Sequence, residues 1–145
     1  MPSRYREVGP VATLLIGLSL LSCSRTFTIK ADGDIHDSIK FSFYRNDEPV
    51  DLRIVEFVVQ QKASDGHWSV IWELHGAEDL SAIEYGKQYN GLAIAVPPKT
   101  LQPDTRYRAL AHELSGLNPE GHSAVAFSLD EGGHVMPDSL LDRLE

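Results

Sequence analysis

Hydrophobic and polar residues alternate with a period of two along several short segments of the chain. Phe27 and Ile29 alternate with polar neighbours, and the apolar positions of 39–44 do the same. Because successive side chains of a strand point to opposite faces, each such segment predicts a β-strand. Clusters of Gly, Pro, Asn and Asp separate the segments and predict turns. We therefore expect an all-β, antiparallel fold.

The segment 67–75, HWSVIWELH, shows the alternation most clearly. Ile71 is the one residue that departs from it. The face predicted to be buried carries Trp68, Val70, Trp72 and Leu74. The face predicted to be exposed carries His67, Ser69, Glu73 and His75.

Further segments bring the prediction to about seven strands. Residues 52–61 are apolar on both faces at their centre, as expected for a strand inside a sheet. Residues 92–96 form a short apolar run that ends at two prolines, and 105–114 and 123–129 alternate again. Residues 77–85, AEDLSAIEY, fit either one helical turn or an irregular crossing between strands.

The amino end of the chain has a different character. Arg4 and Arg6 precede an uncharged, leucine-rich stretch at 8–22. A basic start followed by a short apolar segment is typical of an export signal. A membrane-spanning helix needs roughly 20 apolar residues, and this run is shorter and interrupted by Pro10. We expect residues 1–22 to be a signal peptide that is removed.

The single cysteine closes this apolar stretch, in the tetrad Leu20-Leu21-Ser22-Cys23. The tetrad resembles the lipobox of bacterial lipoproteins. The resemblance implies that Cys23 is lipidated and becomes the first residue of the mature chain, with 23–26 as a tether. Because each buried methylene contributes about 0.8 kcal/mol, several acyl chains would hold the protein stably at the bilayer.

The length and the charge of the chain limit the number of domains and the kinds of partner. The 145 residues predict one domain, and their formal net charge is −8, or −9 after loss of residues 1–22. This acidic balance argues against nucleic acid as a partner. In the lipoprotein family, a residue such as Ser24 rather than aspartate after the cysteine implies the outer membrane, with the domain facing the periplasm. The expected partners are the lipid bilayer, through acylated Cys23, and an envelope protein.

The stretch 101–107, LQPDTRY, resembles the segment between the fifth and sixth strands of fibronectin type III domains. The matching positions are Leu101, Pro103, Thr105 and Tyr107. The resemblance implies an immunoglobulin-like or fibronectin type III-like β-sandwich over residues 27–130. In such a tyrosine corner, the ring of Tyr107 lies in the core and its hydroxyl bonds to upstream backbone.

The second predicted strand departs from the sequence pattern of that family. The core tryptophan usual on the second strand of that family has no counterpart in 39–45, so Phe41 or Phe43 would have to fill its volume.

Residues 131–145 are predicted to be a tail, in which Leu140, Leu141 and Leu144 have the spacing of a short helix.

No catalytic residue, cofactor or metal is predicted. The sequence has no Gly-x-Ser-x-Gly elbow and no phosphate-binding glycine loop. The calcium-loop resemblance of Asp32–Asp37 fails where a terminal glutamate is needed, so a solvated turn is favoured there. His112, His122 and His134 fall in or near the last two strands and could hold a metal if they converged, but surface histidines are favoured.

We expect a membrane-anchored bacterial lipoprotein without enzyme activity, acting as a binding or accessory module of an envelope complex. Two other classes stay open at this point. One is a periplasmic inhibitor or immunity lipoprotein, which fits the acidic charge equally well. The other is a metal-dependent enzyme built on the three histidines of the last two strands.

Overall fold

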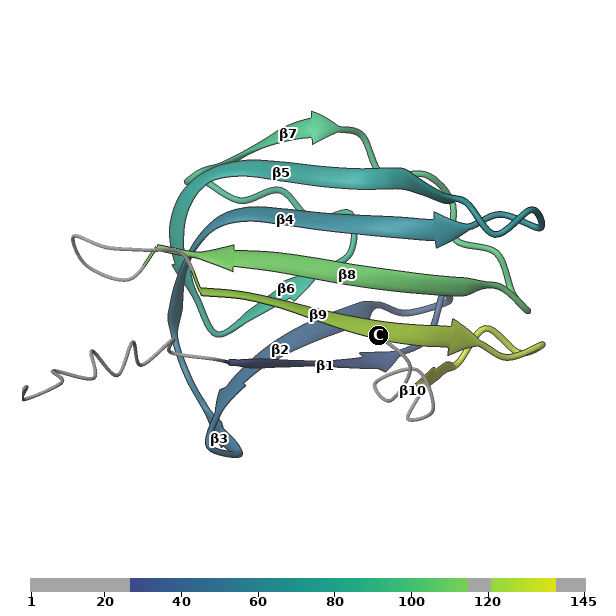
Figure 1. The fold of residues 1–145 in the computed structure, drawn as a ribbon, viewed down its shortest axis with the longest axis horizontal. Coiled ribbons are helices and arrows are strands. Elements are labelled where there is room, and N and C mark those ends of the chain that lie inside the picture. The colour runs from purple at the N-terminus through teal and green to yellow at the C-terminus, as the bar shows by residue number, and fades with distance from the viewer. Residues whose placement is uncertain (1–26, 115–120, 138–145) are drawn as a thin grey trace, which may run out of the picture.

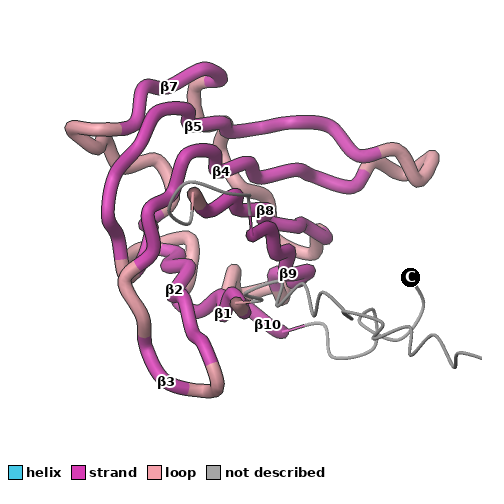
Figure 2. The backbone as a smooth tube through the Cα atoms, turned by 60° about the vertical axis from the view of Figure 1, so that its left-hand side comes forward, coloured by secondary structure: helices cyan, strands magenta, loops and turns pink. Residues whose placement is uncertain are grey.

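The computed structural model describes residues 27–114 and 121–137, which form two antiparallel β-sheets packed face to face (Figures 1 and 2). Strands make up 65% of the described residues, which confirms the predicted all-β sandwich. Residues 1–22, predicted to be a signal peptide, and Cys23 lie outside the described residues. In the described part of the chain, no helix is long and apolar enough to cross a membrane.

The smaller sheet contains four strands, with β2 at its centre. Its members are β1 (Thr28–Gly33), β2 (Ile39–Arg45), β3 (Glu48–Pro49) and β6 (Ala82–Glu84). β1 pairs with one edge of β2, and β3 and β6 pair with the other at different heights. Phe41 of β2 faces Ala31 of β1 in this register, which places their apolar side chains on the same inner face.

The larger sheet contains six strands in the order β10-β9-β8-β4-β5-β7. Its members are β4 (Leu52–Lys62), β5 (Trp68–Leu80), β7 (Leu92–Val96), β8 (Arg106–Glu113), β9 (Gly121–Leu129) and β10 (Val135–Pro137). All seven predicted strands are present, and β3, β6 and β10 are short additions. β10 lies within the segment predicted to be a tail, whereas the predicted helix spacing at 140–144 lies outside the described residues.

Residues 77–85 cross from one sheet to the other without a helix. β5 pairs with β4 as far as Leu80, and the chain then enters β6, where Ala82 pairs with Ser42 of β2. Figure 1 shows the end of β5 curving away from its sheet. The irregular crossing is therefore the correct alternative and the helical turn is wrong.

A β-bulge in β5 changes which side chains reach the core. The register with β4 shifts at Ile71, so that Ile71 and Trp72 are both buried. The extra residue moves Trp68 and Val70 to the outer face, where the guanidinium of Arg108 lies 4.4 Å from the centre of the Trp68 ring. The prediction that Trp68 and Val70 share a face with Trp72 is wrong, because Ile71 is an inserted residue.

Aromatic rings join the two sheets. The fully buried Phe41 packs against Phe57 of β4 and Phe127 of β9, with ring centroids 5.2 and 5.6 Å apart. Phe43 is also fully buried, and its ring meets that of Phe27 at 6.0 Å. Both phenylalanines of β2 thus fill the space between the sheets, as predicted in the absence of a tryptophan on this strand.

Tyr107 has the geometry predicted for a tyrosine corner. Its ring is fully buried and stacks on Phe127 with centroids 5.5 Å apart. Its hydroxyl accepts a hydrogen bond from the Gln102 N–H at 2.7 Å and donates one to the Gln102 carbonyl at 3.2 Å. Burial raises the pKa of Tyr107, which keeps the hydroxyl protonated as a donor. The corner ties the β7–β8 connection to the core.

Candidate functional site

The two ends of the sandwich differ in what they carry. We call the end where β1 begins at Thr28 the tether end; β8 ends and β9 begins there too (Figure 1). The distal end, at the right of Figure 1, carries the β1–β2 turn, the β4–β5 hairpin at 63–67 and the β9–β10 turn at 130–134.

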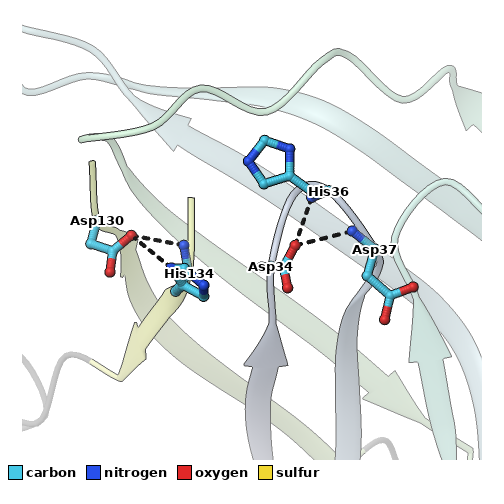
Figure 3. A network of polar contacts seen from close by, with 5 residues as sticks. All are labelled: Asp34, His36, Asp37, Asp130 and His134. Carbon is cyan, nitrogen blue, oxygen red and sulfur yellow. Dashed lines mark hydrogen bonds and ion pairs between the residues drawn. The ribbon is translucent and has the colours of Figure 1, made fainter. Parts of the chain in front are cut away.

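Aspartates organise the backbone of two distal turns, as Figure 3 shows. The Asp34 carboxylate accepts hydrogen bonds from the N–H groups of His36 and Asp37, at 2.8 and 3.0 Å. The Asp130 carboxylate accepts one from the His134 N–H at 2.9 Å. Such bonds fix a turn that would otherwise sample several conformations. The turn predicted at 32–37 is present from Asp34 onward, and its first two residues belong to β1.

Backbone hydrogen bonds connect these turns to one another. The Ile35 N–H donates to the Gly133 carbonyl at 3.1 Å, and Asp34 forms an isolated bridge with His134. The Asp104 N–H donates to the Asp130 carbonyl at 3.3 Å. The two sheets are thus joined at the distal end, and three segments distant in sequence form one braced surface.

Two pockets open at the distal end. One, of about 280 Å³, lies between the β1–β2 turn and the segment 99–101, with Tyr85 in its wall. The other, of about 390 Å³, lies between the start of the β4–β5 hairpin at 61–64 and the segment 104–106. The Tyr85 hydroxyl donates to the Lys99 carbonyl at 2.7 Å, and burial raises its pKa. The Tyr85 side chain is therefore uncharged and held in place by this hydrogen bond, and it forms part of the wall of the first pocket.

We predict that the two turn aspartates stabilise the fold only above the acid range. Hydrogen bonds from backbone N–H groups, of His36 to Asp34 and of His134 to Asp130, lower both carboxyl pKa values below their ordinary value of 3.8. A lowered folded-state pKa means that the stabilisation is complete above pH 3.8 and is lost as pH falls through the lowered values.

Carboxyl-carbon NMR titration should place both folded-state pKa values below 3.8. The Asp130→Ala variant should melt lower than the wild type at neutral pH, and the difference should shrink in strong acid. Exposed Asp51, for which no such backbone bonds are seen, serves as the control through Asp51→Ala. Equal melting temperatures of wild type and Asp130→Ala at neutral pH would refute the turn-fixing role.

The structure brings two of the three predicted histidines together and leaves the third apart. His112 and His122 are cross-strand partners in β8 and β9, with ring centroids 6.1 Å apart. His134 lies beside Asp130 at the distal end, separated from His122 by the length of β9. The three histidines therefore do not form one metal site.

A second cluster, which the sequence reasoning missed, lies on the outer face of the larger sheet. Glu56, Glu73 and His75 offer ligand atoms that all lie within 4.8 Å of one another. His112 extends this group, because its Nδ1 lies 2.5 Å from Glu56 Oε2. The sequence alternation predicted that Glu73 and His75 share an exposed face. It could not predict that Glu56 of β4 and His112 of β8 lie beside them, because this depends on how the strands pair.

Comparison with protein families, with curated proteins and with solved structures finds no match for this chain.

Proposed function

We propose that the chain is a lipid-anchored lipoprotein whose β-sandwich acts as a non-catalytic binding or accessory module of an envelope complex. The observation that carries this proposal is the lipobox-like tetrad ending at Cys23, only four residues before Phe27. Phe27 is itself a buried core residue, so the folded domain follows the proposed lipid attachment point almost directly.

This short spacing supports a definite orientation of the domain. Four extended residues span at most about 14 Å, so a lipid on Cys23 would hold the tether end close to the bilayer. β1 then runs away from the anchor for six residues, which is about 20 Å of strand. The distal end would be the part of the sandwich presented to a partner.

The braced distal turns suit this role. Association costs less conformational entropy when the contact surface is already ordered, and the hydrogen bonds around Asp34 and Asp130 provide such order. Two pockets at this end give side chains of a partner protein places to enter. Ser24 favours the outer membrane as the site of attachment, and the acidic charge favours a protein over nucleic acid.

The test compares partners captured by anchored and unanchored protein. Cells expressing tagged wild type or Cys23→Ser are crosslinked, and co-purifying proteins are identified by mass spectrometry. A third strain carries Asp34→Ala with Asp130→Ala, which loosens the distal turns and leaves the anchor intact. The proposal predicts one abundant envelope protein that the wild type captures, and that both altered proteins capture poorly.

Each component of the proposal has its own contradicting result. Equal capture by wild type and Cys23→Ser would show that anchoring is not needed for the interaction. Equal capture by wild type and the double aspartate variant would move the contact away from the distal end. Capture of no specific protein by any strain would contradict a role as an accessory module.

A further inference from the structure

Four residues form a straight row across the outer face of the larger sheet. His75 of β5 is the cross-strand partner of Glu56 on β4, Glu56 is the partner of His112 on β8, and His112 is the partner of His122 on β9. Directly opposed side chains in a sheet have Cβ atoms about 4.5–5.5 Å apart, so each can contact the next. Glu73 joins the row from β5, two residues before His75 and on the same face.

The side chains of this row already point toward one another. His75 Nε2 lies 2.5 Å from Glu73 Oε1, and His112 Nδ1 lies 2.5 Å from Glu56 Oε2. The ligand atoms of Glu56, Glu73 and His75 lie within 4.8 Å of one another. All of these groups are partly exposed, which leaves them free to rotate and open to an ion from solvent.

The combination of donors selects a class of metal. Imidazole nitrogen and carboxylate oxygen together suit Zn²⁺ and its first-row neighbours, whereas Ca²⁺ and Mg²⁺ prefer oxygen ligands alone. Zinc binds these atoms at about 2.0–2.2 Å, so two ligands of one ion lie no more than about 4.4 Å apart. Small side-chain rotations therefore suffice to gather atoms that lie within 4.8 Å.

We propose that Glu56, Glu73, His75 and His112 bind one divalent first-row transition-metal ion, for which Zn²⁺ is the probe. The two carboxylates give the cluster a negative charge that attracts a cation. The three strands that supply the ligands, β4, β5 and β8, are adjacent in the sheet, so the ion would clamp them together. This proposal is independent of the function proposed above.

A pocket beside the cluster adds room for a further ligand of the ion. It has a volume of about 180 Å³, and Glu56 and His112 line it together with the apolar side chains of Val58 and Leu110. Zinc sites can expand from four to five ligands, so an ion held by all four side chains could take a fifth ligand at a position facing this pocket. A small anion or a donor from a partner could fill that position.

The test is zinc titration of the full chain, purified in detergent without a histidine tag and treated with chelator. All proteins carry Cys23→Ser, so that no thiol competes for the metal. Calorimetry should show one zinc per chain, and a Co²⁺ complex should give the visible absorption of a tetrahedral nitrogen and oxygen site. Zinc should also raise the melting temperature.

Matched variants locate the ion. His75→Ala and Glu73→Gln should each weaken zinc binding at least tenfold, and His112→Ala should weaken it as well. The control is His67→Ala, since His67 is an exposed histidine that pairs with Asp65 in the β4–β5 hairpin, away from the cluster. Because all of these positions are partly or fully exposed, the metal-free variants should melt like the parent.

Three results would overturn the proposal. One is the absence of zinc binding at stoichiometric concentrations. Another is undiminished binding by both His75→Ala and His112→Ala. The third is an equal loss in His67→Ala, which would show that zinc binds surface histidines without preference. In each case the cluster would be a set of histidine–glutamate hydrogen bonds on the sheet surface.

Discussion

Replacing Phe41 with alanine is expected to lower the free energy of unfolding by about 3–5 kcal/mol. Phe41 is fully buried and its ring contacts Phe57 and Phe127, which belong to different strands of the opposite sheet. Truncation removes apolar contacts and leaves a cavity that the rigid strands around it cannot fully close. Domains of this size are stable by about 5–15 kcal/mol, so one substitution should remove a large part of the total.

Urea unfolding followed by circular dichroism measures this loss. Phe41→Leu retains most of the volume and should cost clearly less than alanine. Lys40→Ala, at the exposed neighbouring position of β2, should change stability by no more than about 0.5 kcal/mol. A cost for Phe41→Ala no larger than that for Lys40→Ala would contradict the packing of β2 against the larger sheet.

Replacing Arg45 with alanine is expected to lower the free energy of unfolding by about 1–3 kcal/mol, the cost of leaving a buried polar group without its partner. Arg45 ends β2 and Glu113 ends β8. Across the tether end, Nη2 of Arg45 donates to both carboxylate oxygens of Glu113, at 2.9 and 3.1 Å. Only 7% of the Glu113 side chain is exposed. Without Arg45 its carboxylate would remain buried without its partner, which costs more than the loss of the contact itself.

A pair of the same chemistry on the surface provides the control. Arg53 and Asp79 lie 3.3 Å apart, but their side chains are 50% and 68% exposed. Water screens such pairs, so Arg53→Ala should change stability by less than about 1 kcal/mol. Chemical denaturation of both variants separates the two cases. Similar costs for Arg45→Ala and Arg53→Ala would show that burial does not set the strength of the inner pair.

A variant with both Glu113→Gln and Arg45→Ala tests whether the unpaired charge of Glu113 causes the loss of stability. If the cost of Arg45→Ala comes from an unpaired buried charge, removing that charge should restore part of the lost stability. A double-mutant cycle built from the single and double variants would then give a coupling energy between the two residues.

Local pattern was sufficient to predict the strands and one corner of this fold. Alternation at 39–44 and 105–114 identified β2 and β8, because one face of each strand is buried and the other is not. The resemblance of 101–107 to a tyrosine corner predicted that the Tyr107 hydroxyl bonds to upstream backbone, and the structure shows that this backbone is that of Gln102. These features depend on residues close together in sequence.

Features that depend on strand register could not be predicted in the same way. The bulge at Ile71 exchanges the faces of Trp68 and Val70, although nothing in the local alternation shows which residue is inserted. The partners of Glu56 become visible only when β4 lies between β5 and β8. His134 appeared close to the other histidines in sequence, but the length of β9 carries it to the opposite end of the sandwich.

The proposed function depends above all on a lipid at Cys23 that anchors the domain. Intact-mass spectrometry of the protein extracted from membranes determines whether this lipid is present. We expect a chain that begins at Cys23 and carries the added mass of a diacylglycerol and an amide-linked acyl chain. A chain that retains residues 1–22, or one that is cut elsewhere and keeps an unmodified thiol, would contradict it.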